Sequence, residues 1–517
     1  MYPDFAVPIS PADGSSVATP HSHDISVRQL LSRNLAEIVR DIPIKNPVEI
    51  RQLAGYQILV VRDKSLFKTL PDSENLGRGQ SHDYVKRIFG ADTIFMLPAS
   101  EKHSQKKAEL NNWLSKGRIQ AMVPDIAAEA ACAVDSMLAH SAEPIDMDAY
   151  VLRYLFAVAA QAITGAPVRL GEHVGAFQAN MGTMLSSASS TVQLALSSIS
   201  RLFGHLLSCR ARGAAEGMFE IGKILLRAGM QNSQPNLALD MLGRHGIDPK
   251  QIDGETPFPQ ELLHDISMTF AASIFTTSNL VLGAIHYFCR EPEQLRELRI
   301  SMENDFPGGV RNVKQLTLNP TLRMLWPVML QQSSVDLAVR DVVAAGQFQD
   351  SAGTQYQINK GDIVVFDLAG TQKSLMDDLS SRMNALPAAS PFLDLLDARH
   401  NDVNVAFFAG SNQCPGRRLF AADGLLLLLE VLQRMDVRLE APDRGMQPGL
   451  VNTFPGATRM TVRPPAALDD DLHRQLLGGR PPMPEPELTA GRPSTACLQP
   501  GFPVIRAAPH VRNPLNP

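Results

Sequence analysis

One cysteine near the C-terminal end of the sequence stands in a setting that favours thiolate chemistry. Cys414 lies in the segment FFAGSNQCPG (residues 407–416), which is rich in turn-forming residues. The following segment, residues 417–435, is apolar nearly all round, so we expect a buried helix there. The helix dipole and the free backbone N–H groups at its start stabilise a thiolate. Such a thiolate is either a metal ligand or a nucleophile.

The composition excludes several classes of protein. The formal net charge is −5 over 517 residues, so nothing predicts binding to nucleic acid or to an anionic membrane. The five cysteines are scattered and form no CxxC pair, which argues against zinc ribbons and thioredoxin-like redox motifs and fits a reducing compartment. They are Cys132, Cys209, Cys289, Cys414 and Cys497.

The organisation of the chain predicts one large, mainly helical domain between two irregular ends. Residues 1–25 are polar and proline-rich without the features of a signal peptide, and we expect them to be disordered or extended. Residues 26–466 form the predicted domain, and residues 467–517 a proline-rich extension. No uninterrupted apolar stretch reaches the roughly 20 residues that span a bilayer, so we expect a cytoplasmic protein with no membrane span.

Two predicted helices carry residues that suit ligand binding. Ser100 is placed to cap a helix, on which His103 and Lys107 share one face and suit an anionic group such as a carboxylate; the alternative is a solvated face. A long apolar helical stretch covers residues 259–299, and hydroxyl residues around Thr276 and Thr277 interrupt it. These hydroxyls either adjoin a ligand or bond to the preceding helical turn.

The remaining patterns predict shorter elements. Apolar spacing predicts a helix over residues 25–40, and the β-rich run at residues 55–63 predicts part of a small sheet. Asn319 and Pro320 suit the N-cap and the first position of a further helix. Short strands are expected within residues 328–368, at residues 437–440 and at residues 457–464.

The cysteine segment resembles the haem-binding loop of the cytochrome P450 family, which matches at Phe407, Gly410, Cys414 and Gly416. The resemblance covers roughly residues 43–463. It implies a mainly α fold with small β-sheets, and haem b (iron protoporphyrin IX) with Cys414 as the axial ligand that promotes O–O cleavage. It also implies monooxygenation of a small lipophilic substrate in specialised metabolism, with electrons from NAD(P)H through a reductase and a ferredoxin or flavodoxin.

The resemblance also assigns roles to individual residues. His103 and Lys107 would bind a haem propionate. Asn412 stands two residues before the cysteine, where the family has another residue that contacts a propionate. Thr276, with Thr277 beside it, falls at the oxygen-handling threonine of the family. The resemblance also places Arg323 and Arg399 in the haem-binding core, Phe407 against the porphyrin, and Gly410 and Gly416 in the loop.

The sequence departs from the family at positions that bear on mechanism. Phe275 stands where the family has an acid directly before the threonine, and a phenylalanine cannot carry a proton. Ser273 stands where the family has a glycine. The glutamate that normally pairs with Arg323 is replaced by Pro320, so Arg323 needs another acceptor, such as a backbone carbonyl. Asn412 replaces a basic residue and carries no charge.

These departures leave three functions open. Monooxygenation leads, because Thr276 and the thiolate loop are kept. The second is a haem-thiolate peroxygenase or a hydroperoxide isomerase or lyase, which needs no reductase; the third is a degenerate protein that binds haem or a lipophilic ligand without turnover. We expect a monomer, in which Arg417 and Arg418 either dock the electron donor, are solvated at the start of the helix, or lie beside the haem propionates. Because nothing marks His400 as a catalytic base for Cys414, an iron ligand is the favoured role of this thiol.

Overall fold

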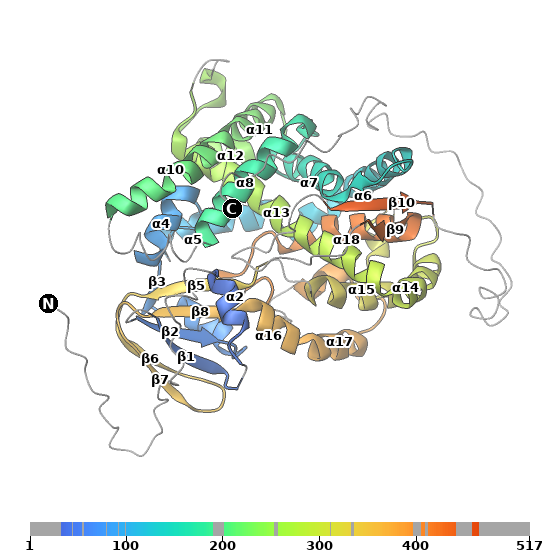
Figure 1. Ribbon diagram of the computed structural model, residues 1–517. Coiled ribbons are helices and arrows are strands. Elements are labelled where there is room, and N and C mark those ends of the chain that lie inside the picture. Colours follow the sequence, from blue (N-terminus) through green and yellow to red (C-terminus); the bar gives the residue numbers. More distant parts are fainter. Residues whose placement is uncertain are drawn as a thin grey trace.

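The computed structural model describes residues 33–43, 45–53, 56–78, 80–90, 92–98, 100–189, 201–252, 257–310, 312–331, 335–396, 405–408, 412–440 and 458–464. The predicted terminal segments, residues 1–25 and 467–517, lie outside these ranges. Figure 1 shows the two parts of the molecule, with most helices at the upper right and the largest sheet at the lower left.

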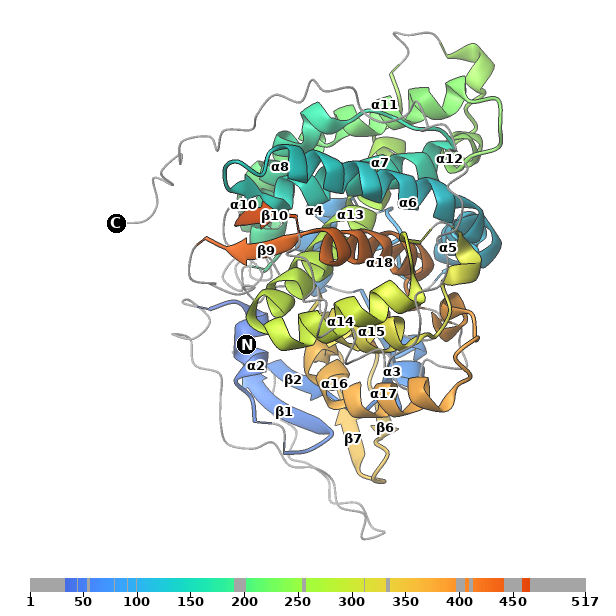
Figure 2. The ribbon, with the colours of Figure 1, turned by 90° about the vertical axis from the view of Figure 1, so that its right-hand side faces the viewer.

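Two long helices form the centre of the helical part (Figures 1 and 2). They are α13 (Gln260–Arg290) and α18 (Arg417–Arg434), and they pack against each other. On its other sides α13 contacts α7 (Met147–Thr164), and α18 contacts α6 (Lys116–Ala139). Because α18 is apolar nearly all round, almost all of its residues are buried, as the sequence predicts.

The other α-helices of the described residues surround this centre or flank the sheet. In chain order they are α2 (Leu35–Arg40), α3 (Leu66–Thr69), α4 (Gln80–Phe89), α5 (Glu101–Trp113), α8 (Val174–Ser189), α10 (Arg201–Gly217), α11 (Phe219–Gln231), α12 (Leu237–Arg244), α14 (Pro292–Asp305), α15 (Pro320–Gln331), α16 (Leu368–Ser374) and α17 (Met376–Ala385).

The strands form three sheets. The largest has the order β1-β2-β8-β5-β3, with strands β1 (Val48–Leu53), β2 (Tyr56–Val61), β8 (Ile363–Asp367), β5 (Leu337–Val342) and β3 (Leu76–Gly77). In it β2 and β8 run parallel, and the other neighbours run antiparallel. The smaller sheets are β4-β10-β9, with β4 (Ile145–Asp146), β10 (Arg459–Arg463) and β9 (Asp436–Leu439), and β6-β7, with β6 (Gly346–Gln349) and β7 (Gln355–Ile358).

The largest sheet is covered on both faces, which explains why β8 reads as a continuous apolar run. Val364 and Phe366 pack into one apolar cluster, while Val365 packs into another with residues of α2. The predicted fold class, mainly α with small β-sheets, is confirmed.

Two predicted elements differ from the structure. The stretch 259–299 is two helices, because Pro292 lacks a backbone N–H and starts α14. The helix predicted over residues 25–40 begins, within the described residues, only at Leu35, where Asn34 and Glu37 form a capping box. The short strands predicted within residues 328–368 are present as β5 to β8.

Other predicted boundaries are confirmed. The Ser100 hydroxyl caps α5 by accepting a 3.2 Å hydrogen bond from the His103 backbone N–H. Helix α15 starts at Pro320, and the Asn319 side chain caps it by accepting a 2.9 Å bond from the backbone N–H of Leu322.

A glycine sets the separation of α13 and α18. A β-carbon at Gly424 would lie 3.4 Å from Thr277 Cγ2, 3.4 Å from Met329 Cε and 3.3 Å from Phe420 Cε2. These distances are short for carbon contacts, so a larger side chain would push the helices apart.

We predict that Gly424→Leu lowers the free energy of unfolding by about 1–3 kcal/mol through overpacking. Gly243→Leu in α12 is the matched control, because a β-carbon there meets nothing within 4 Å. Urea denaturation measures both variants, and equal stabilities of the two would refute the close packing at Gly424.

Candidate active site

Cys414 lies on a short loop that leads into α18. Its backbone N–H donates a 2.7 Å hydrogen bond to the carbonyl oxygen of Phe407. The backbone N–H groups of Gly416 and Arg417 are directed at the thiol sulfur, as expected at the start of a helix. The Arg417 guanidinium secures the loop by donating to the carbonyl oxygens of Cys414 (2.9 Å) and Leu396 (3.0 Å).

Opposing effects act on the pKa of the Cys414 thiol. Burial raises this pKa, while the backbone N–H groups of Gly416 and Arg417 and the Arg417 and Lys107 cations lower it; burial prevails. The side chain is nevertheless accessible to solvent. A metal cation at the sulfur would reverse the balance and hold the thiolate form.

Two consecutive phenylalanines anchor the loop on opposite sides. Phe407 stacks on Trp326 in the helical core, with 19° between the ring planes. Phe408 has a φ angle of +58°, which is rare for a bulky residue, and its ring packs edge-on against Phe366 of β8. The loop is therefore held between the helical core and the sheet.

The two predicted loop glycines differ in what the structure says of them. Gly410 lies outside the described residues. Gly416 has an ordinary φ angle of −77°, and a methyl group there would lie 3.7 Å from the Cys414 sulfur. Gly416 is therefore not required by the backbone conformation.

The predicted pair on α5 lies on the side of the cysteine loop. His103 is buried, and desolvation, with the Arg78 and Lys107 cations, lowers its pKa to about 4, so the ring is neutral at pH 7. Desolvation lowers the pKa of Lys107 to about 8, against the opposite effect of Cys414. The mutual influence of Lys107 and Cys414 shows that these two groups are near each other.

Two further basic residues, which the sequence analysis missed, lie near His103. Arg78 donates to the carbonyl oxygen of Leu97 (2.5 Å), and Arg340 of β5 donates to Asn412 Oδ1 (3.0 Å). Asn412 in turn donates to Asp72 Oδ1 (3.0 Å), so it bridges Arg340 and Asp72. Burial lowers the pKa of both arginines, although a guanidinium remains charged in proteins.

We call Arg78, Lys107 and Arg340 the cationic cluster. Each acts electrostatically on His103, which places the three around this residue. In the described part of the chain neither Arg78 nor Arg340 forms an ion pair with a carboxylate within contact distance, and the carboxylates that act on the cluster are Asp72 and Asp341. Three half-buried cations against two carboxylates leave an excess of positive charge, which suits an anionic ligand group.

Helix α13 presents a partly exposed face within its largely buried middle. Thr269, Ala272, Ser273 and Thr276 are partly exposed, and their spacing puts them on one side of the helix. The Thr276 hydroxyl donates to the carbonyl oxygen of Ala272 (2.9 Å), and the Ser273 hydroxyl to that of Phe270 (2.7 Å). These hydroxyls thus bond to the preceding turn and also lie on the accessible face.

Thr277 and Thr276, predicted together as catalytic, lie in different surroundings. Thr277 is buried, its hydroxyl donates to the Ser273 carbonyl oxygen (2.9 Å), and its methyl group is directed at Gly424 of α18. Thr277 therefore has a packing role, and Thr276 is left as the candidate. Phe275 is partly buried and packs against the helical core.

Arg323 bonds to the backbone instead of a glutamate. Its Nε donates to the carbonyl oxygen of Leu318 (2.7 Å) and its Nη2 to that of Leu386 (2.6 Å). Because Pro320 replaces the glutamate of the family, backbone carbonyls are expected as the acceptors of Arg323, and these two fill that role. These contacts give Arg323 a role in steadying α15. Arg399 and His400 lie outside the described residues.

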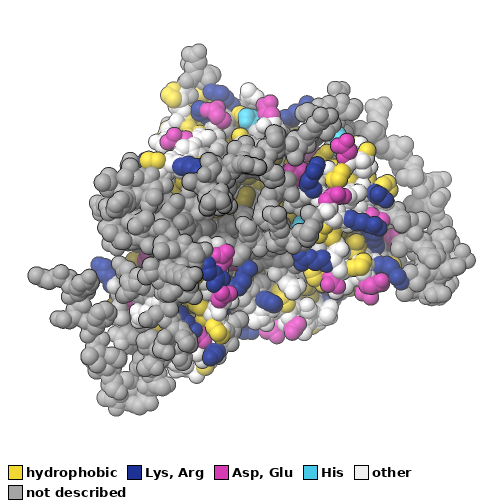
Figure 3. All heavy atoms as spheres, viewed as in Figure 1, with side chains coloured by type: hydrophobic (Ala, Val, Ile, Leu, Met, Phe, Trp, Pro, Cys, Tyr) yellow, Lys and Arg dark blue, Asp and Glu magenta, His cyan; other side chains and the backbone are white. Residues whose placement is uncertain are grey.

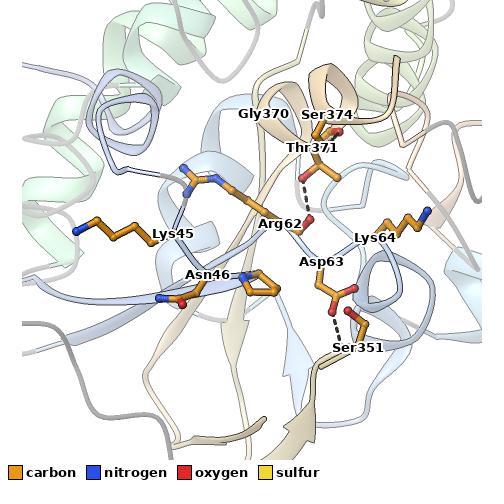
Figure 4. A pocket seen from close by; sticks show the side chains of 10 residues that line it. Lys45, Asn46, Arg62, Asp63, Lys64, Ser351, Gly370, Thr371 and Ser374 are labelled. Atoms are coloured by element: carbon orange, nitrogen blue, oxygen red, sulfur yellow. Dashed lines mark hydrogen bonds between the residues drawn. The ribbon is translucent and has the colours of Figure 1, made fainter. Parts of the chain in front are cut away.

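A surface pocket of about 340 Å³ contains none of the predicted site residues (Figure 4). Its charged groups serve the fold: Arg62 donates to Asp367 Oδ2 (2.6 Å), and Asp63 accepts a 2.6 Å bond from the backbone N–H of Ser351. The lining residues are Lys45, Asn46, Pro47, Arg62, Asp63, Lys64, Ser351, Gly370, Thr371 and Ser374. On the face in Figure 3, basic and acidic side chains of the described residues are interspersed.

Comparison with solved structures identifies the cytochrome P450 fold. The structure compared is that of retinoic acid-bound cyanobacterial CYP120A1, a cytochrome P450, which matches with a TM-score of 0.59 over 81% of this chain and 92% of that chain. The two sequences are 16% identical. No protein-family model matches the sequence, and no curated protein matches it. The likeness establishes the fold, and the chemistry rests on the residues of this chain.

Helix α13 is, among the described residues, the one long and apolar enough to cross a membrane. Within its most apolar window, 72% is buried inside the protein. A core helix of a soluble protein has this character, which agrees with the place of α13 at the centre of the fold.

The cytochrome P450 fold implies a haem, and the residues around Cys414 fit that group. The thiol is accessible, as an iron ligand requires, and backbone N–H groups at the start of α18 are directed at its sulfur. The cationic cluster lies beside it and suits the carboxylates of the haem.

We predict that Arg340→Met speeds haem release from the purified protein about 10- to 100-fold, since a buried charge-assisted hydrogen bond contributes about 1.5–3 kcal/mol. Transfer of haem to excess apomyoglobin measures the rate. Arg438→Met is the matched control, because Arg438 is exposed on β9. Equal release rates from both variants would contradict the role of Arg340.

Proposed function

We propose that the protein is a haem-thiolate oxidoreductase in which Cys414 is the axial ligand of haem b. The observation that carries this proposal is the position of the thiol, on a loop anchored at both sides, at the start of the buried helix α18 and beside the cationic cluster. When bound, the haem supplies the oxidising chemistry, which the chain alone lacks.

The leading reaction is monooxygenation of a small lipophilic substrate. In support, Thr276 keeps a partly exposed position on the accessible face of α13, where a hydroxyl is able to order water or a substrate group. The compared CYP120A1 structure holds retinoic acid, which is such a molecule. In this chain the segments that determine substrate specificity would include residues within 166–208. Residues 190–200 of this range lie outside the described residues.

Electrons would come from NAD(P)H through a reductase and a ferredoxin or flavodoxin. The structure corrects one part of this prediction, because Arg417 is 8% exposed and bonds to two carbonyl oxygens inside the protein. Arg417 therefore secures the cysteine loop and is not available to dock a partner. Arg418 is partly exposed and keeps the predicted docking role.

Phe275 favours a second candidate function. With a phenylalanine where an acid would be expected, α13 offers no carboxylate beside Thr276 to carry protons. A peroxygenase or a hydroperoxide isomerase needs no such delivery of protons to dioxygen. In either function the protein would act as a cytoplasmic monomer.

We predict that Cys414→Ala abolishes the thiolate-type Soret band in the carbon-monoxide difference spectrum of the reduced protein, because the sulfur ligand is lost. Cys209→Ala is the matched control, since Cys209 is exposed on α10. A thiolate-type band that survives in Cys414→Ala would refute the assignment, and a wild-type protein without haem would refute the function.

We predict that Phe275→Asp raises the fraction of electrons recovered in product with a ferredoxin system by about tenfold or more, because a positioned acid speeds proton transfer. Phe275→Leu is the control that removes the ring without adding an acid. Peroxide-driven turnover of the two variants should differ little. Unchanged coupling in Phe275→Asp would show that protons arrive by another route.

A further inference from the structure

Two lysines of α5 contact two acidic residues of α13. Lys102 Nζ lies 2.8 Å from Glu261 Oε1, and Lys106 Nζ lies 2.6 Å from Asp265 Oδ2. The two lysines are one turn apart on α5, and the two acidic residues are one turn apart on α13. The two ion pairs therefore lie one above the other, like the rungs of a ladder. Both lysines also bind Asp92, Lys102 at the carboxylate (2.7 Å) and Lys106 at the carbonyl oxygen (2.5 Å). We call Lys102–Glu261 the outer rung and Lys106–Asp265 the inner rung.

The two rungs differ in burial. The side chains of the outer rung are 46% and 40% exposed, and such surface pairs contribute little because water screens them. Those of the inner rung are 2% and 3% exposed. Separating the partners of a buried pair leaves an uncompensated buried charge, which is strongly destabilising. The inner rung therefore restricts how α5 is able to turn relative to α13. Arg244 of α12 adds a second cation 3.4 Å from Asp265.

The rungs determine which side of α5 faces the cysteine loop. His103 and Lys107 each follow a rung lysine by one residue, which places them about 100° further around the helix. If Lys102 and Lys106 are held against α13, then His103 and Lys107 are turned toward the cationic cluster, where their mutual electrostatic effects place them.

The inner rung also lies on the accessible side of α13. Thr276 follows Asp265 by eleven residues, which is close to three helical turns and about 16 Å along the axis. Asp265 and Thr276 therefore lie on the same side of α13, together with Thr269 and Ala272. The inner rung thus joins α5 to the helix side that carries the candidate Thr276.

We propose that Lys106 and Asp265 are positioning residues, which fix the rotation of α5 so that Lys107 is held beside the Cys414 thiol and the haem carboxylates. Neither residue touches the reacting group. The part that concerns haem rests on the proposed function, and the part that concerns Lys107 and Cys414 does not.

The test compares the double variant Lys106→Met/Asp265→Leu with Lys102→Met, which breaks the outer rung and the Lys102 contact with Asp92 but leaves the inner rung intact. An apolar pair of similar volume often preserves stability, and Arg244 keeps its 3.0 Å contact with Glu109. We expect the double variant to melt like the wild type and to release haem to apomyoglobin at least tenfold faster, while Lys102→Met stays within twofold. A folded double variant that releases haem at the wild-type rate overturns the proposal.

A second variant covers the case in which the double variant fails to fold. Asp265→Glu keeps the charge and shifts the inner rung by one methylene group, so it should fold and release haem several-fold faster. Release from Asp265→Glu at the wild-type rate would overturn the proposal in that case.

A haem-independent readout separates this proposal from the proposed function. In haem-free protein a short amine-to-thiol cross-linker should join Lys107 to Cys414, because the two groups lie near each other, and peptide mass spectrometry measures the yield. The double variant should give at least severalfold less of this cross-link, while Lys102→Met should give as much as the wild type. An unchanged yield in the double variant would overturn the proposal even if the wild type bound no haem.

Discussion

The buried start of α18 is the constraint on which the rest of the site depends. A helix that is apolar nearly all round has to lie inside the protein, and its N-terminal N–H groups then point into the interior with the thiol of Cys414 in front of them. In that position burial opposes the charged thiolate, and the nearby N–H groups and cations only partly offset it. These surroundings therefore suit a thiolate whose negative charge is stabilised by a bound metal cation.

The other elements hold this arrangement in place. Phe407 and Phe408 anchor the loop to the helical core and to the sheet, and Arg417 closes it through two carbonyl oxygens. Helix α5 brings Lys107, and β5 brings Arg340, so the cationic cluster is assembled from elements far apart in the sequence. Gly424 lets α13 lie close to α18 at the same level as Thr277.

What could be predicted from the sequence followed local physics. The burial of α18 and the cap of α5 at Ser100 depend on short-range patterns, and both are confirmed. The backbone acceptors of Arg323 were predicted from the departure at Pro320, and one of them, Leu386, is distant in the sequence. The break at Pro292 was a local signal that was overlooked, since proline favours the first turn of a helix.

Other features depended on distant contacts. Arg78 and Arg340 carry no local signature, and only the tertiary structure places them near His103, with Arg340 bonded to Asn412 of the loop. Which of two adjacent threonines faces inward depends on the rotation of α13, so only the structure shows that Thr277 is buried while Thr276 is partly exposed. The docking role given to Arg417 failed for the same reason, because burial of its side chain follows from tertiary structure.

The central claim is that the Cys414 sulfur binds haem iron, and X-ray absorption at the iron edge tests it most directly. For the purified ferric protein we predict four porphyrin nitrogens and one sulfur at bonding distance from iron, with the sulfur absent in Cys414→Ala. An iron coordinated by nitrogen and oxygen alone in the wild-type protein would contradict the account.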